Sequence, residues 1–171
     1  MPSDKELLHT DQALQLDKQL CFALYSTSLA MTKLYKPLLQ ALDVTYPQYL
    51  ALLALWEQDG QSVSSLGEKL FLDSGTLTPL LKRMEQAGLL QRQRSPADER
   101  RVTIHLTAAG QALKEKARSI PFCVFSATSC PLSELVELTR QIQGLRQRLL
   151  SSVAPAANDS QPLPPQAAAQ P

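Results

Sequence analysis

Residues 62–107 read SVSSLGEKLFLDSGTLTPLLKRMEQAGLLQRQRSPADERRVTIHLT, and the order of element types in this stretch decides the fold. Apolar spacing predicts a short helix over 62–71 and a longer helix over 76–87, with a polar break at 73–75 between them. Gly88 suits the end of the second helix, because glycine adopts positive φ without a Cβ clash.

Two strands are predicted to follow, over 89–94 and 101–107, with residues 95–99 as the turn that joins them. Helix, turn, helix and hairpin in this order predict a winged helix-turn-helix. The charge agrees, since six basic residues minus three acidic residues leave a local +3 within a chain of formal net charge +1. The charged residues counted are Lys82, Arg83, Arg92, Arg94, Arg100 and Arg101 against Glu85, Asp98 and Glu99.

The amino-acid composition is that of an ordinary globular protein. The 171 residues are 44% hydrophobic and 19% charged, enough to bury a core. No apolar run approaches the ~20 residues that span a bilayer, and the polar, acid-bearing start is unlike a targeting peptide. We therefore expect a cytoplasmic protein without a membrane partner. Three cysteines without CxxC, and the isolated His9 and His105, predict no metal site and no cofactor.

The two ends of the chain carry long leucine stripes. Helical spacing of apolar residues predicts a first helix over 11–41, kinked or ended near Pro37, and a last helix over 131–150. The small winged module alone cannot bury both stripes. We therefore expect the terminal helices to pair with their copies in a homodimer. The predicted fold class is mainly α with a small β-hairpin wing, the terminal helices forming a dimerisation domain.

Two further helices are predicted between these parts. Residues 46–58, preceded by a capping box at Thr45, are apolar nearly all round and predict a buried helix. Residues 108–119 form the helix after the hairpin. Residues 120–130 fit either a loop or a helix interrupted at Pro121. The resulting division comprises an N-terminal dimerisation helix, a winged DNA-binding module, C-terminal dimerisation helices and a disordered tail, at 1–45, 46–107, 108–150 and 151–171.

A module of this kind offers one helix to the DNA major groove, and only the outer face of that helix reaches the bases. On the 76–87 helix the inward residues are predicted to be Leu77, Leu80, Leu81 and Met84. The candidate DNA contacts of the helix and its start are Ser74, Thr76, Thr78, Pro79, Lys82 and Arg83.

The hairpin is predicted to bring Arg94, Arg100 and Arg101 together at a protruding tip, where arginine can enter the minor groove. Asp98 is placed to hold the side chain of Arg100. The alternative is an ordinary solvated basic face. Charge, helix order and hairpin together favour DNA.

The module resembles the core of the MarR family of bacterial regulators, whose hairpin motif DxRxVxxxLT is present over 98–107. More closely, DSGTLTPLLKRMEQAGL, LCFALYSTSLAMTKLYKPLL and LDVTYPQYLALLALWE resemble the organic hydroperoxide resistance regulators over about residues 15–150. The resemblance implies a dimeric repressor that binds an inverted-repeat DNA operator and senses organic hydroperoxide through one cysteine. The half-sites should lie about one helical turn of DNA apart.

By this resemblance Cys21 is the reactive cysteine, and Tyr35 and Tyr46 are its hydrogen-bonding partners. Cys21 and Tyr35 are fourteen positions apart, or roughly 21 Å along an unbroken helix. If Tyr35 touches Cys21, it must therefore come from the other chain. The reacting species is the thiolate, which two phenol O–H donors would stabilise. The alternative is a buried, inert core cysteine.

The sequence offers more than one thiol to resolve the oxidised Cys21. Two-cysteine members carry a segment resembling FCATGC before the last helix, whereas this chain reads FSATSC, with Ser126 in place of the expected cysteine. The N-terminus of the adjacent helix should make the Cys130 thiol more acidic, whereas Cys123 looks more buried. Either of these thiols, or a small external thiol, remains open as the resolving partner.

Two rival functions remain. A thiol peroxidase built on Cys21 lacks a thioredoxin-like pattern and CxxC, so we expect no enzyme. The other rival is a regulator of the same fold released by a small aromatic or lipophilic ligand, with inert cysteines.

Overall fold

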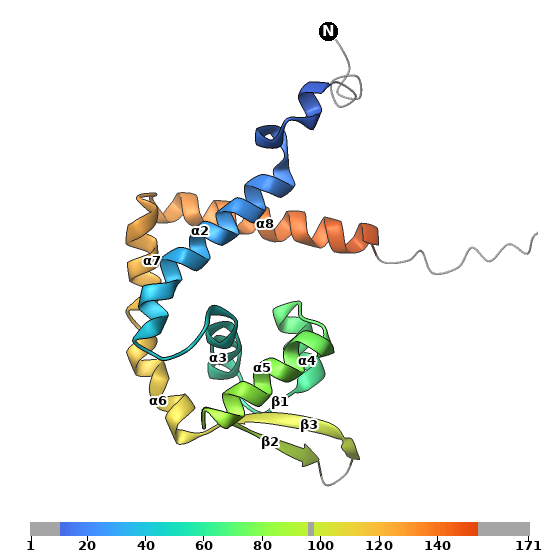
Figure 1. Cartoon of the computed structure of the whole chain (residues 1–171), viewed down its shortest axis with the longest axis vertical. Coiled ribbons are helices and arrows are strands. Elements are labelled where there is room, and N and C mark those ends of the chain that lie inside the picture. Colours follow the sequence, from blue (N-terminus) through green and yellow to red (C-terminus); the bar gives the residue numbers. More distant parts are fainter. Residues whose placement is uncertain (1–10, 96–97, 154–171) are drawn as a thin grey trace, which may run out of the picture. The chain divides into compact units, whose positions relative to one another are not determined.

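The computed structural model describes residues 11–95 and 98–153, and of residues 95 and 98–101 only the backbone. The chain divides into two compact units, one that runs to Ala127 and one that starts at Thr128. The first unit holds nearly all elements and is built from helices around a small antiparallel sheet (Figure 1). Its elements in chain order are η1 (Asp11–Leu14), η2 (Leu16–Lys18), α2 (Leu20–Gln40), α3 (Tyr46–Glu57), β1 (Gln61–Ser62), α4 (Val63–Leu70), α5 (Ser74–Gln86), β2 (Leu90–Ser95), β3 (Asp98–Leu106), α6 (Ala108–Ala117) and α7 (Ile120–Thr128).

Helix α3 forms the centre of the core, as its uniform apolarity predicts. The backbone N–H of Thr45 donates to Gln48 Oε1 at 2.7 Å, which fixes the start of the helix. Leu52 and Leu55 are almost completely buried, and each such side chain contributes about 1.5–3 kcal/mol when removed from water. The buried residues of α3 are Tyr49, Ala51, Leu52, Ala54 and Leu55.

Helices α4 and α5 form the predicted helix-turn-helix. Each starts at a side-chain cap, Ser62 accepting from the Ser65 N–H and Asp73 accepting from the Thr76 N–H. Gly88 follows α5 with φ +72°, as predicted for a helix end. Gly110 in α6 is needed for a different reason, since a Cβ there would lie 2.0 Å from the Leu89 carbonyl oxygen.

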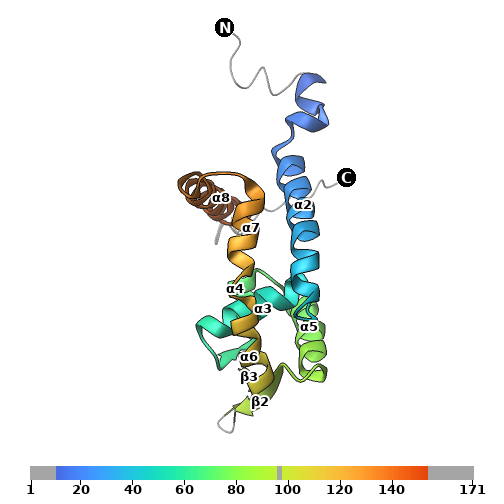
Figure 2. The ribbon, with the colours of Figure 1, turned by 90° about the vertical axis from the view of Figure 1, so that its left-hand side faces the viewer.

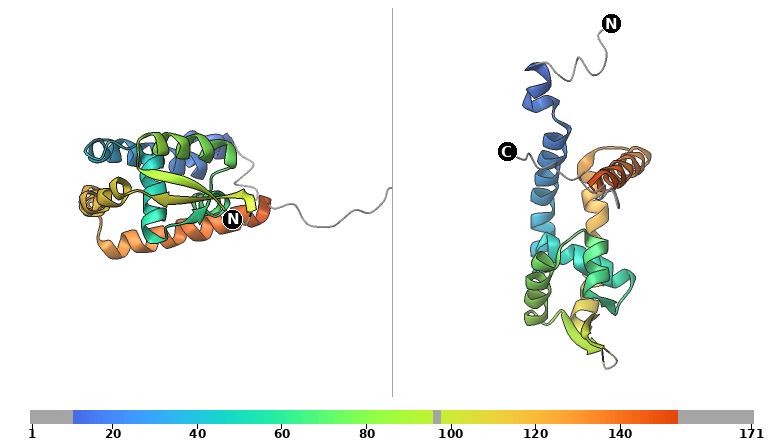
Figure 3. Two further views of the ribbon diagram at one scale, coloured as in Figure 1. Left: turned by 90° about the horizontal axis from the view of Figure 1, so that it is seen from below. Right: turned by 90° about the vertical axis from the view of Figure 1, so that its right-hand side faces the viewer.

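The sheet is three-stranded and antiparallel, in the order β1-β3-β2. The short strand β1 was not predicted. The predicted turn over 95–99 is too long, because Ser95 pairs with Asp98 and β3 begins at Asp98. Pairing with a neighbouring strand overrides the turn preference of these polar residues. The hairpin lies alongside α5 in two views (Figures 1 and 3).

The first helix is shorter than predicted. The helix α2 begins at Leu20, and residues 11–18 form two 3₁₀ turns instead. Leu14 in these turns is 81% exposed, and a helical turn without a buried face gains little from packing. Pro37 neither ends nor interrupts α2, which continues to Gln40. The N-terminal half of α2 projects beyond α3, α4 and α5 (Figure 2).

Residues 120–128 form the helix α7, so the loop interpretation is wrong. Pro121 is the second residue of α7, in the first turn, where the missing N–H costs little. Ile120 and Val124 face the core of the first unit.

The second unit contains the helix α8 (Leu132–Val153), which begins one residue later and ends three residues later than predicted. None of its residues is buried, although it carries the predicted leucine stripe. Among the described residues no single helix is long and apolar enough to cross a membrane; the stretches 108–128 and 132–153 pass that test only as a broken pair, on length and composition. The rest of the predicted disordered tail, from 154 onward, lies outside the described residues.

Candidate DNA-binding face and redox site

Helix α5 has the inward and outward faces that its sequence predicts. Leu77, Leu80, Leu81 and Met84 are all buried. The candidate contacts of the helix are exposed except for Thr78, which is half-buried; those exposed are Ser74, Thr76, Pro79, Lys82 and Arg83. The two cations thus lie on an outer face that is open to a DNA backbone.

One candidate contact already has a partner. The hydroxyl of Thr76 donates to Asp73 Oδ2 at 3.0 Å, and the Thr76 N–H donates to Asp73 Oδ1. These bonds hold the pKa of the Asp73 carboxyl below its usual range. Thr76 therefore belongs to the cap of α5 as well as to its outer face.

The wing is described only in part. Arg94 is exposed on β2. The predicted contacts Asp98, Arg100 and Arg101 lie on β3, and their side chains are outside the described residues. Their grouping at the hairpin tip stays a prediction.

Arg92 has a role that its charge alone did not indicate. Its Nε lies 2.7 Å from Glu85 Oε2 in an ion pair between β2 and α5. Sequence counting treated both as separate members of one charged surface. A signal was present in the spacing, since Glu85 lies in the last turn of α5 and Arg92 lies near the start of the following strand.

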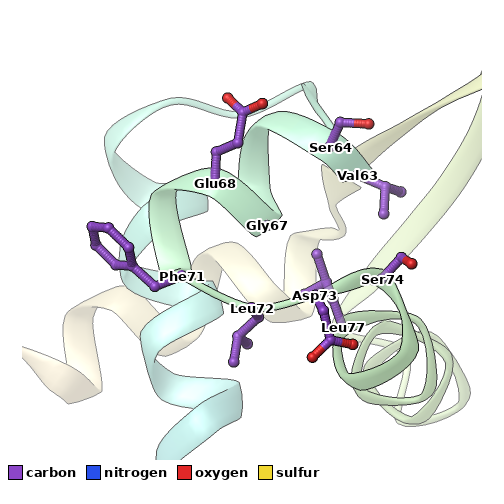
Figure 4. A pocket seen from close by; sticks show the side chains of 9 residues that line it. All are labelled: Val63, Ser64, Gly67, Glu68, Phe71, Leu72, Asp73, Ser74 and Leu77. Atoms are coloured by element: carbon purple, nitrogen blue, oxygen red, sulfur yellow. The ribbon is translucent and has the colours of Figure 1, made fainter. Parts of the chain in front are cut away.

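A cleft of about 540 Å³ lies beside α4 and the start of α5 (Figure 4). Its lining includes the carboxylates of Glu68 and Asp73 and no lysine or arginine. This surface suits neither phosphate nor another anion, so the basic face of α5 is the better site for DNA.

Three tyrosines form a cluster where α2 meets α3. The rings of Tyr35 and Tyr46 are 4.7 Å apart, and those of Tyr35 and Tyr49 are 5.9 Å apart. Burial, and next the neighbouring Tyr46 and Tyr49, raise the pKa of Tyr35 to about 12. Burial also raises the pKa of Tyr46. Both phenols are therefore O–H donors at neutral pH.

Cys21 is distant from this cluster in its own chain. It lies in the first turn of α2, and Tyr35 lies in the same unbroken helix, so their backbones are roughly 21 Å apart at 1.5 Å per residue. Cys21 is exposed. It is therefore not a core cysteine of the single chain, and the structure brings Tyr35 and Tyr46 together without it.

The other two cysteines differ from the sequence interpretation. Cys123 is exposed, not buried, because α7 turns Ile120 and Val124 inward instead. Cys130 is half-buried, and its thiol donates to the Thr128 carbonyl oxygen at 3.3 Å. His105 fills a position in β3, as predicted, and its Nε2 lies 3.1 Å from Thr103 Oγ1. No cluster of three metal-binding side chains occurs within the described ranges.

Known proteins resemble this chain over most of its length. The sequence profile of the SarA/Rot transcriptional regulators matches residues 33–117. The organic hydroperoxide resistance transcriptional regulator of Bacillus subtilis is 52% identical over 80% of this chain and 92% of its own. The chain belongs to the MarR family, among the organic hydroperoxide resistance regulators.

Solved structures of this family agree with the fold. Reduced AbfR bound to DNA is 35% identical, with a TM-score of 0.71 over 84% of this chain and 98% of AbfR. AbfR, a protein of Staphylococcus epidermidis, also has a structure with a disulfide formed, 39% identical with a TM-score of 0.54 over 78% of this chain and 94% of that one. The winged helix-turn-helix prediction and the family resemblance are thus confirmed.

Proposed function

We propose that this chain is a dimeric repressor of the cytoplasm that leaves its DNA operator when an organic hydroperoxide oxidises Cys21. The observation that carries the proposal is the paired Tyr35 and Tyr46, both protonated donors, at the opposite end of α2 from an exposed thiol. A second copy whose α2 runs the other way would bring each Cys21 to its partner's tyrosines.

Apolar exposure supports the dimer. The N-terminal half of α2 exposes Leu20, Phe22, Tyr25 and Leu29, and α8 exposes several more large apolar side chains along the predicted stripe. Apolar surface of this extent marks an association site. The DNA partner follows from the basic outer face of α5, which would lie in the major groove of each half of an inverted repeat.

The chemistry needs no cofactor. The Cys21 thiolate attacks the hydroperoxide, the O–O bond breaks, and an S–O bond forms while the alcohol leaves. Sulfur is oxidised by two electrons, and the peroxide is reduced by the same two. A second thiol then displaces water from the sulfenic acid and leaves a disulfide. Tyrosine O–H donors stabilise the thiolate before attack by hydrogen bonding to its charge.

The resolving thiol that best fits this scheme is Cys123. It is exposed, whereas Cys130 is half-buried and its thiol donates to a carbonyl in its own turn. A small external thiol is the alternative if neither cysteine forms the bond.

Operator binding before and after cumene hydroperoxide tests the function. We expect the wild type to lose affinity on oxidation and Cys21→Ser to keep it. Cys123→Ser should stop at the sulfenic acid or a mixed disulfide, while Cys130→Ser should behave as the wild type, both followed by intact-mass spectrometry. Unchanged wild-type affinity after complete oxidation of Cys21 contradicts the proposal.

One observation supports a ligand-released regulator as a second candidate. A mostly apolar cleft of about 350 Å³ adjoins Tyr46 and carries Lys33 and Lys36, which suit a small aromatic acid. Release by such an acid that persists in Cys21→Ser would favour this alternative. Steady turnover of peroxide with a thiol reductant would instead favour a thiol peroxidase.

A further inference from the structure

The last turn of α5 is fastened to the strand β2 by one carboxylate. Arg92 Nε donates to Glu85 Oε2 at 2.7 Å, and the Arg92 backbone N–H donates to Glu85 Oε1 at 3.1 Å. The side chains are only 32% and 34% exposed, so water screens the pair incompletely. Both carboxylate oxygens are therefore engaged by the same residue of the wing.

The backbone bond follows from the sheet topology. β2 is an edge strand, with β3 on one side and no strand on the other among the described residues. An N–H on the open side of an edge strand needs an acceptor from outside the sheet. Glu85 supplies that acceptor at Arg92.

The side-chain bond directs Arg92 back toward the helix. Arg92 pairs with Ile104 in β3 and lies two positions from Leu90, hence on the same face of the strand. Leu90 and Ile104 are both buried, so this face is turned to the core. From this face the Arg92 side chain reaches Glu85 in the last turn of α5, and its Nε is engaged there.

Two other arginine–glutamate pairs have no such reach. Arg118 with Glu115, at the end of α6, and Arg140 with Glu137, within α8, each join residues only three apart. These ion pairs link neighbouring turns whose separation the helix backbone already fixes, so they do not connect separate elements. The Glu85–Arg92 pair instead joins two elements that meet DNA in different grooves.

We propose that Glu85 and Arg92 form a clamp that sets the angle between the recognition helix and the wing, with Arg92 a positioning residue rather than a phosphate contact. The inference rests on the DNA binding proposed above. A helix in the major groove and a wing in the minor groove bind together only when their separation is fixed. Without the clamp the wing can take other angles, so affinity falls although every phosphate contact is kept.

Simple electrostatics makes the opposite prediction for Glu85. Removal of an acid from a DNA-binding face should strengthen binding, because less negative charge meets the phosphates. The clamp predicts that Glu85→Gln weakens binding. If Arg92 met phosphate, Arg92→Gln would also flatten the salt dependence, because each phosphate that a protein neutralises adds about 0.9 to the slope.

The experiment uses a duplex that the reduced wild type selects from a random pool, titrated over a salt series. We expect Glu85→Gln and Arg92→Gln each to bind roughly three- to thirtyfold more weakly with unchanged slope, a range set by couplings of contacting pairs. The double variant should bind no more weakly than either single one. Arg118→Gln is the matched ion-pair control and should bind as the wild type, while Lys82→Gln should flatten the slope.

Amide hydrogen exchange of the free protein tests the clamp without DNA. The Arg92 amide should exchange faster in Glu85→Gln than in the wild type and be unaffected in Arg118→Gln. Tighter binding by Glu85→Gln, a flattened slope in Arg92→Gln, or unchanged exchange at Arg92 each overturns the clamp. If the wild type selects no sequence, the DNA-binding proposal fails, and the exchange measurement alone decides the clamp.

Discussion

The winged module and the helix α8 are both rich in leucine but bury it differently. In the module, α3 and α5 bury their apolar residues against one another and against the sheet. In α8 no residue is buried, and Leu138 remains 49% exposed. An apolar stripe therefore does not by itself show where its residues are buried. Those of the module are buried within its own unit, whereas those of α8 are not buried within theirs.

The largest expected effect comes from emptying the core of the module. Leu52→Ala removes a fully buried side chain of α3 and should lower the free energy of unfolding by about 2–5 kcal/mol. Leu53→Ala is the matched control, because the neighbouring Leu53 is 37% exposed and its loss should cost about 0.5 kcal/mol or less. Urea unfolding followed by circular dichroism at fixed protein concentration measures both. Equal losses of stability in the two variants would contradict a module core that is held together by buried residues such as Leu52.

The next largest effect concerns the exposed apolar face of α8. Leu138→Asp combined with Ile142→Asp places charges on the exposed apolar face of α8, and burial of unpaired charge in an interface is strongly unfavourable. We expect the wild type to sediment as a dimer and the double variant as a monomer with its winged module still folded. Gln143→Asp, one residue beyond Ile142 on a polar part of the helix, should leave the dimer intact. A double variant that remains dimeric would show that this face of α8 is not part of the dimer interface.

The smallest effect at neutral pH lies in the tyrosine cluster. The folded pKa of Tyr35 is raised from 10.0 to about 12, so the folded state favours the protonated phenol. Stability from this group is complete below pH 10, where both states are protonated, and declines as pH rises from 10 to about 12. Tyr35→Phe should show a shallower loss of stability over that window. Ultraviolet absorbance should show one phenol titrating near pH 12 in the wild type, and its absence would contradict the buried cluster.

Much of the module could be predicted from sequence because its signals are local. The apolar spacing of α5 indicates which four residues turn inward, and Asp73 and Gly88 mark its ends. The failures share a different cause. Pairing of Ser95 with Asp98, the turn of α7 that exposes Cys123 and the engagement of Arg92 by Glu85 all depend on contacts that periodicity does not contain. Charge counting placed Arg92 in the basic region and did not indicate its ion pair with Glu85.

The unbroken length of α2 acts as a spacer that no side chain can bridge. A solitary subunit carries both the thiol and the phenols, yet it keeps them too far apart to meet. In the proposed dimer, dilution would therefore silence the peroxide response together with operator occupancy, since both need the same association step. Newly made subunits would become reactive toward peroxide only after they dimerise, so the onset of sensing would depend on the concentration of the protein in the cell.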